Sequence, residues 1–151
     1  MRVAWIGAAA LLLSHAAATA EPLPLGWDKA LAAAAPVAVT AEPVAITGGD
    51  LAGLTLSGAW VLRGDHRNFG GFSGLVVSQG RLFAVSDRGW WFGAALIEGD
   101  GALRLANARL APMRDDAGDR YTKAGGDAEG LTRLGDQLVV SFERDHRLMF
   151  L

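Results

Sequence analysis

Two segments of this chain repeat the same order of features, and this repeat limits the fold more than any other property of the sequence. "FSGLVVSQGRLFAVSDRGWW" aligns with "AEGLTRLGDQLVVSFERDHR", so that Gly74 falls on Gly130 fifty-six residues later. After the turn glycines, residues 82–86 match residues 137–141 with a one-residue slip, and a charged cluster follows each serine. A period in the fifties with several short strands per unit is typical of a β-propeller blade.

The chain beyond residue 43 consists of short apolar runs separated by glycine. Apolar and polar residues alternate in several of these runs, as they do in half-buried strands. "EGDGAL" places Asp100-Gly101 between two runs, a strong signal for a type I′ hairpin, and "SQGRL" and "LGDQL" predict further tight turns. No stretch here has the pattern of an amphipathic helix. We therefore predict an all-β chain built of antiparallel meander blades of the β-propeller type.

The length of the repeated region predicts an incomplete propeller. A propeller closes with four or more blades, whereas residues 44–151 supply about two. The chain also stops within an apparent strand, "HRLMFL", which would leave an apolar edge unpaired. We expect residues 44–151 to be the N-terminal part of a longer domain. A small self-contained sandwich is the alternative that the pattern leaves open.

The first twenty residues have the layout of a secretory signal peptide. Arg2 precedes an apolar run over residues 3–13, and small residues then lead to Ala18-Thr19-Ala20. Eleven apolar residues are too few for a membrane span, which needs about 20. We expect cleavage after Ala20 and a periplasmic or secreted protein. Residues 21–43, rich in alanine and proline, form a predicted lead-in to the domain.

Charge and cysteine content exclude several classes of protein. The net charge is −2, and removal of residues 1–20 would take away one basic and no acidic residue. A slightly acidic protein lacks the basic footprint of a nucleic-acid binder. With no cysteine in the chain, an exported protein has no disulfides, so its fold must depend on its core or on bound ions.

Three familiar kinds of site receive little support from the sequence. Ser73 lies in "GFSGL", which lacks the final glycine of a nucleophile elbow and precedes a strand instead of a helix. Ser73 is better explained as a turn residue bonded to its own backbone. His66 and His146 have no paired spacing for zinc. The loop "DDAGDRY" lacks the glycine and the closing glutamate of an EF-hand, which favours a solvated acidic turn.

Four carboxylates stand at predicted strand ends or entrances: Asp87, Asp127, Glu129 and Glu143. Carboxylates on loops are typical ligands of calcium, which takes 6–8 oxygens. In the register of the repeat, Glu129 enters one strand and Glu143 leaves its hairpin partner, so both could reach the same end of the sheet. Two carboxylates converging without a cation would repel each other and raise their pKa values.

That repulsion could be relieved by calcium or by basic partners. The nearby arginines are Arg88, Arg144 and Arg147. Arginines beside a cation also suit bidentate binding of phosphate oxygens. The residue pattern alone supports a structural salt-bridge cluster and a functional cation site equally well.

Four motifs in series carry a resemblance to a known family: "FGGFSGL", "AVSDRG", "DAEGL" and "VSFERDHRL". Together with the preceding "LAGLTLSGAWVL", they make residues 50–151 resemble the phytase-like domain of bacterial exported proteins with esterase-like activity. The resemblance implies a β-propeller considerably longer than this chain. Distant relatives, the β-propeller phytases, are calcium-dependent phosphatases with a similar D-x-E-G strand entrance facing a calcium-lined channel. By that resemblance, Asp127 and Glu129 would be calcium ligands or their near neighbours, with Glu143 and Asp87 as weaker counterparts.

The resemblance leads to an expectation about function. We expect an exported, calcium-assisted phosphoester hydrolase acting on a small-molecule phosphoester, with phosphate held by Arg88, Arg144, Arg147 and Lys123. The alternative is a non-catalytic propeller that binds a ligand or a protein in the cell envelope. Residues 90–92, Trp-Trp-Phe, would then be a contact patch, although burial between blades is the simpler explanation for them. Nothing in the sequence indicates a catalytic residue or an oligomeric state.

Overall fold

The computed structural model describes residues 8–9, 30–45, 56, 58–99 and 101–151. Within these residues, Ala30 and Leu31 are helical and every assigned element is a β-strand, which confirms the predicted all-β class. No helix in the described part of the chain has the length and apolar character needed to cross a membrane. The strands are β1 (Ala8–Ala9), β2 (Ala35–Pro36), β3 (Val39–Pro43), β4 (Trp60–Gly64), β5 (Phe72–Ser78), β6 (Arg81–Ser86), β7 (Trp90–Gly99), β8 (Ala102–Pro112), β9 (Ala128–Leu134), β10 (Gln137–Phe142) and β11 (Arg147–Phe150).

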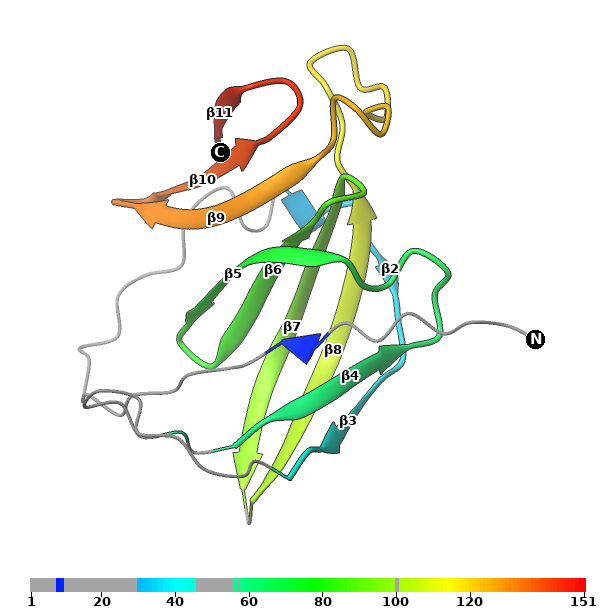
Figure 1. Ribbon diagram of the computed structural model, residues 1–151, viewed down its shortest axis with the longest axis vertical. Helices are drawn as coiled ribbons and strands as arrows, with labels where there is room; N and C mark the ends of the chain where they lie inside the picture. Colours follow the sequence, from blue (N-terminus) through cyan, green and yellow to red (C-terminus); the bar gives the residue numbers. More distant parts are fainter. Residues whose placement is uncertain (1–7, 10–29, 46–55, 57, 100) are drawn as a thin grey trace.

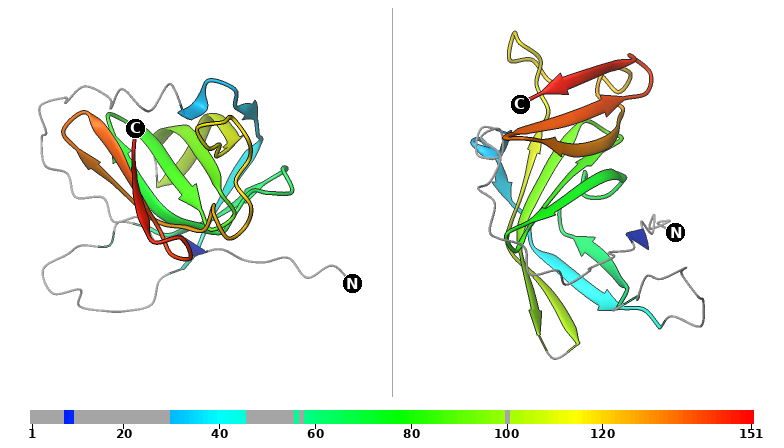
Figure 2. Two further views of the ribbon diagram at one scale, coloured as in Figure 1. Left: turned by 90° about the horizontal axis from the view of Figure 1, so that it is seen from above. Right: turned by 90° about the vertical axis from the view of Figure 1, so that its left-hand side faces the viewer.

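The strands form three antiparallel sheets. The largest has the order β2-β8-β7-β6-β5, so β5 to β8 are a four-stranded meander extended by β2 (Figure 1). β9, β10 and β11 form a second meander, and β1, β4 and β3 form the third sheet. The sheets follow one another without closing into a ring (Figure 2). This arrangement agrees with the predicted propeller-like blades.

The repeat is present in the structure with a constant offset of fifty-six residues. Strand β9 begins and ends fifty-six residues after β5, and β10 does so after β6. Outside the strands the same offset holds: the Asp87 amide donates to the Gly71 carbonyl over 2.9 Å, and the Glu143 amide donates to the Asp127 carbonyl over 3.0 Å. The two hairpins are therefore equivalent residue by residue.

The one-residue slip predicted from the two serines is wrong. Each hairpin contains a β-bulge, with Ser73 as the extra residue of β5 and Glu129 as the extra residue of β9. The bulges occupy the same position, so the offset stays constant, and Ser141 corresponds to Val85 instead of Ser86. The serines match in type but not in structural position.

Three predicted turns connect strands as expected. Gln79 and Gly80 have φ values of 49° and 68° between β5 and β6, as a type I′ turn requires of both central residues. Gly135, with φ of 59°, lies between β9 and β10. The β7–β8 hairpin pairs Gly99 with Ala102, and Asp100 of its predicted turn lies outside the described residues.

The five-stranded sheet is buried on both faces, because successive side chains of a strand point to opposite sides. Phe83 and Val85 face the second meander and pack with Leu138, Val140 and other apolar residues there. The alternating residues of β6 and β7, such as Leu82 and Phe92, form a separate cluster with residues from β3 and β4. The first of these clusters holds the second meander against the first, and the other cluster holds β3 and β4 against the opposite face.

The aromatic segment at residues 90–92 belongs to these two cores. Trp90, Trp91 and Phe92 are only 8%, 4% and 0% exposed. Trp91 stacks on Phe83 with ring centroids 5.4 Å apart, while Trp90 and Phe92 lie in the cluster on the other face. The idea that they form an exposed contact patch is therefore wrong, and packing between sheets explains them.

The N-terminal predictions fall mostly outside the described residues. Of the predicted signal peptide, residues 1–20, only β1 is described, and it pairs with β4. In the predicted lead-in, β2 pairs with β8 and β3 pairs with β4. Residues 35–43 thus extend the sheets of the domain that follows.

Candidate metal-binding site

Three carboxylates converge where β9 begins and β10 ends. Asp127 directly precedes β9, Glu129 is its bulge residue, and Glu143 directly follows β10. Antiparallel pairing brings these two strand ends together, and one oxygen from each carboxylate lies within 4.8 Å of the other two. The structure therefore brings together three of the four carboxylates that the sequence marks as cation ligands.

The three carboxylates differ in burial and in partners. Asp127 is only 5% exposed, and the Arg144 Nε donates to its Oδ2 over 2.6 Å. Glu129 and Glu143 are exposed. Partial desolvation, and then the charges of Glu143, Asp127 and Asp87, raise the pKa of Glu129 above its usual value. Without a cation, the cluster thus retains unfavourable like-charge repulsion at Glu129.

The fourth predicted carboxylate, Asp87, belongs to the first meander. It directly follows β6 and is the structural equivalent of Glu143. Its Oδ1 is buried and has no hydrogen-bond partner among the described residues, and the Arg88 Nε is 4.0 Å away. Asp87 is not one of the three converging carboxylates, but its charge acts on Glu129. The candidate site therefore draws negative charge from both meanders.

Glycine is required beside Asp87. Gly71 has φ of +64°, and a Cβ at this position would collide with the Asp87 Oδ1. The equivalent residue of the second meander is Asp127, so the repeat has a glycine in one copy and a site carboxylate in the other. The Asp87 carboxylate occupies the space that a side chain at position 71 would need.

Ser73 connects the two meanders. The prediction that it is a turn residue bonded to its own backbone is wrong. Its Oγ donates a hydrogen bond to the carbonyl of Ala128, the residue before Glu129, and lies 3.5 Å from the carbonyl oxygen of Val85. At the next residue, a Cβ on Gly74 would lie 2.7 Å from the Gly130 carbonyl carbon. The sequence analysis missed these positioning residues, although "GGFSGL" marks a close approach of two backbones.

The predicted phosphate-binding residues occupy different environments. Arg144 and Arg88 lie beside site carboxylates, with side chains 57% and 45% exposed. Lys123 is exposed on the loop between β8 and β9, four residues before Asp127. Arg88 and Arg144 are also equivalent residues of the repeat, so each meander places one arginine directly after its site carboxylate.

Arg147 supports the loop before Asp127. Its guanidinium carbon lies 3.8 Å from the centroid of the Phe142 ring and 4.9 Å from that of Tyr121. Its Nη2 donates to the Gly125 carbonyl over 2.6 Å. Arg147 has these interactions in the folded chain, so its contacts favour a structural role over phosphate binding.

The alternatives weighed from the sequence have structural explanations. The Asp115 Oδ1 accepts the amides of Ala117 and Asp119, which agrees with a self-contained acidic turn. The His66 Nδ1 accepts the amide of Asn68 over 3.2 Å, and its ring lies 5.3 Å from that of Trp90. Among the described residues, neither segment contributes to a group of metal-ligating side chains.

Comparison with known proteins identifies the family. A family model named phytase-like, and described as the esterase-like activity of phytase, matches residues 67–150, more than half of the chain. The chain belongs to the phytase-like family. The matched segment of this phytase-like chain contains both meanders and all eight predicted site residues. No curated protein and no solved structure matches the chain.

Replacement of Glu129 by glutamine is expected to stabilise the ion-free protein at neutral pH. The raised pKa means that the folded state favours the protonated form, so charged Glu129 destabilises the fold and this cost disappears as the pH falls. Glu129 is exposed, so the gain should be small, about 0.5 kcal/mol or less. Melting temperatures in a chelator at pH 7 and pH 4 would measure it. Glu98→Gln, at an exposed position on β7, is the control, and a less stable Glu129→Gln protein at pH 7 would contradict the prediction.

Proposed function

We propose that this phytase-like protein is an exported, calcium-assisted phosphoester hydrolase with its cation site at Asp127, Glu129 and Glu143. The observation that carries the proposal is the convergence of three carboxylate oxygens within 4.8 Å. The membership of the chain in the phytase-like family supports the class of reaction. Small-molecule phosphoesters are the proposed substrates.

The donor set fits a hard divalent cation. Calcium is bound by carboxylate and carbonyl oxygens at distances that tolerate irregular geometry. The three converging carboxylates supply such oxygens, and the buried Oδ1 of Asp87 is a further oxygen with no hydrogen-bond donor among the described residues. A cation at this place would remove the repulsion that raises the pKa of Glu129. We therefore assign Asp127, Glu129 and Glu143 as ligands, with Asp87 beside them.

The basic residues of the site would bind and orient the substrate. Calcium, when bound, supplies charge neutralisation for a phosphoester and activates a water molecule. Arg144 holds Asp127 through its Nε and is more than half exposed, so its remaining donors face solvent. Arg88 is similarly exposed beside Asp87. Both guanidinium groups can therefore bind phosphate oxygens in a bidentate way while staying next to the carboxylates.

Export would bring the site to the calcium that it needs. We propose that residues 1–20 are a signal peptide cleaved after Ala20, which would leave the domain in the periplasm or outside the cell. Calcium sites of extracellular modules typically bind with dissociation constants of about 10⁻⁴ to 10⁻³ M. A site made of two exposed carboxylates and one buried carboxylate suits this range.

Release of phosphate from p-nitrophenyl phosphate tests the proposal. We expect turnover with millimolar calcium, loss of turnover in a chelator, and at least a tenfold lower rate for Glu143→Gln, because the cluster loses one charged ligand. Glu98→Gln, which removes an exposed carboxylate far along β7, should retain full activity. Calcium binding without any turnover would contradict the hydrolase and favour a non-catalytic binding module.

A further inference from the structure

A second candidate site lies on the five-stranded sheet, away from the carboxylates. A pocket of about 170 Å³ lies between β6, β7, β8 and the segment at Leu31 and Ala32. Its floor consists of Gly93, Ala94 and Ala95 of β7. Arg81 begins β6 and Asp87 follows its end, so roughly 20 Å of extended strand separates Arg81 from Asp87.

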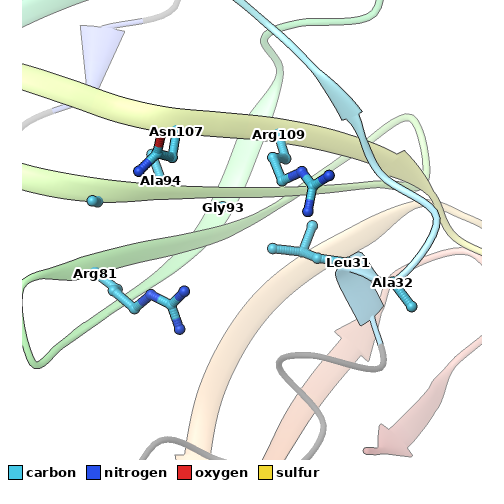
Figure 3. Close-up of a pocket in the computed structure, with 8 residues that line it drawn as sticks. Leu31, Ala32, Arg81, Gly93, Ala94, Asn107 and Arg109 are labelled. Atoms are coloured by element: carbon cyan, nitrogen blue, oxygen red, sulfur yellow. The ribbon is translucent and has the colours of Figure 1, made fainter.

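Two arginines flank this pocket on one face of the sheet. Arg81 of β6 pairs with Ala95 of β7, and Gly93 of β7 pairs with Arg109 of β8. Residues two apart on a strand share a face, so both arginines lie on the same side, with β7 between them. In Figure 3 both guanidinium groups point into the space beside Leu31. No carboxylate is among the described residues that line the pocket.

A β-bulge adds an amide to the same pocket. The register of β7 and β8 shifts between Gly93 and Ala95, where β8 has an extra residue, and Asn107 there has φ of 52°. Bulges redirect a side chain, and asparagine tolerates the left-handed conformation better than most residues. Asn107 consequently lines the pocket beside Ala94 (Figure 3).

Gly93 and Leu31 determine the shape of the pocket. A Cβ on Gly93 would collide with the Leu31 Cδ1 and lie 3.4 Å from the Phe83 Cδ2, so a larger residue there would displace the wall. Leu31 therefore closes one side of the pocket directly over the glycine. The result is a hollow with an apolar wall, two guanidinium groups and one side-chain amide.

We propose that this pocket binds a small oxyanion, with a phosphate or a carboxylate group held by Arg109, Arg81 and Asn107. The Arg109 guanidinium provides the bidentate donors that both groups prefer, the Asn107 amide adds a neutral donor, and Arg81 adds positive charge to the lining. The Arg109 side chain has no hydrogen bond or ion pair among the described residues, so its donors are available. The site is independent of the proposed hydrolase, because it shares no residue with the acidic cluster.

Titration calorimetry with inorganic phosphate and with acetate tests the site, using the full chain at low salt in a buffer freed of divalent cations on a chelating resin. Without divalent cations, phosphate cannot bind through the acidic cluster. We expect saturable binding that weakens roughly tenfold or more in Arg109→Gln, since a charged hydrogen-bonded partner is lost. Asn107→Gly should weaken it less while allowing the same backbone conformation. Tighter phosphate binding identifies a phosphoryl site, and tighter acetate binding identifies a carboxylate site.

Arg104→Gln is the matched control, because Arg104 is an exposed arginine on the same strand that does not line the pocket. The Arg104→Gln variant should bind phosphate and acetate as tightly as the unmodified protein does. Absence of saturable binding for both anions would overturn the proposal, as would an equal loss in Arg104→Gln and Arg109→Gln. Melting curves of each variant verify folding, and Arg109→Lys provides a second variant that keeps the charge but loses the bidentate fork.

Discussion

The double variant Asp127→Asn with Glu129→Gln is expected to lose the calcium-dependent increase in thermal stability. A ligand that binds only the folded state stabilises it by about 2.7 kcal/mol at a concentration of one hundred times its dissociation constant. For a chain of this size, that corresponds to roughly 5–10 °C in melting temperature. Neutral amides replace two of the three converging carboxylates in this variant, so most of that shift should disappear. Melting with and without about 10 mM calcium, one hundred times a dissociation constant of about 10⁻⁴ M, measures it.

A direct titration of calcium separates binding from changes in intrinsic stability. Asp127→Asn weakens the pair with Arg144, whereas Glu129→Gln relieves repulsion, so the ion-free melting temperature alone does not report on the site. The matched control is Asp116→Asn with Glu98→Gln, which also removes two negative charges at exposed positions. An unchanged calcium affinity in the site variant would contradict the assignment of the cation site, and with it the proposed mechanism.

Gly74→Ala is expected to destabilise the contact between the two meanders by about 3 kcal/mol. The added Cβ would collide with the Leu131 backbone nitrogen and lie 2.7 Å from the Gly130 carbonyl carbon. Overpacking typically costs about 1–3 kcal/mol, and backbone atoms of a paired strand cannot rotate away as a side chain can. Chemical denaturation monitored by tryptophan fluorescence measures the free energy of unfolding.

Gly99→Ala is the control for the cost of a methyl group in a strand. Gly99 ends β7, its φ is outside the left-handed region, and nothing lies within 4 Å of an added Cβ. The free energy of unfolding of the Gly99→Ala variant should equal or slightly exceed that of the unmodified protein, because alanine restricts the unfolded chain more than glycine does. Equal stabilities of the Gly74 and Gly99 variants would show that β5 and β9 do not approach as closely as the structure indicates.

Local patterns in the sequence were sufficient for the strands, the turns and the order of the repeat. Alternation of apolar and polar residues depends on the two-residue period of a strand, and the turn at Gln79-Gly80 depends on residues that tolerate positive φ. Both are properties of neighbouring residues. The convergence of Glu129 and Glu143 was predictable for a similar reason, since a hairpin brings the start of one strand to the end of the next.

Contacts between sheets were not predictable in the same way. The hydrogen bond from Ser73 to the Ala128 carbonyl joins residues fifty-five positions apart, and nothing near Ser73 in the sequence identifies that partner. The constant offset of the repeat was missed because residue types were matched, and the bulges at Ser73 and Glu129 appear only as a change of strand register. The pocket between Arg81 and Arg109 likewise depends on three strands and a bulge.

The sequence by itself determined that this chain is an all-β, blade-forming member of the phytase-like type with carboxylates at its strand ends. These features follow from side-chain periodicity, turn chemistry and short motifs, which are all local. Only the tertiary structure decided that Asp87 of one meander lies close enough to act on Glu129 of the next, and that Arg147 packs on aromatic rings. Those outcomes depend on how two sheets pack face to face, where burial of the shared core sets the distance between residues far apart in the chain.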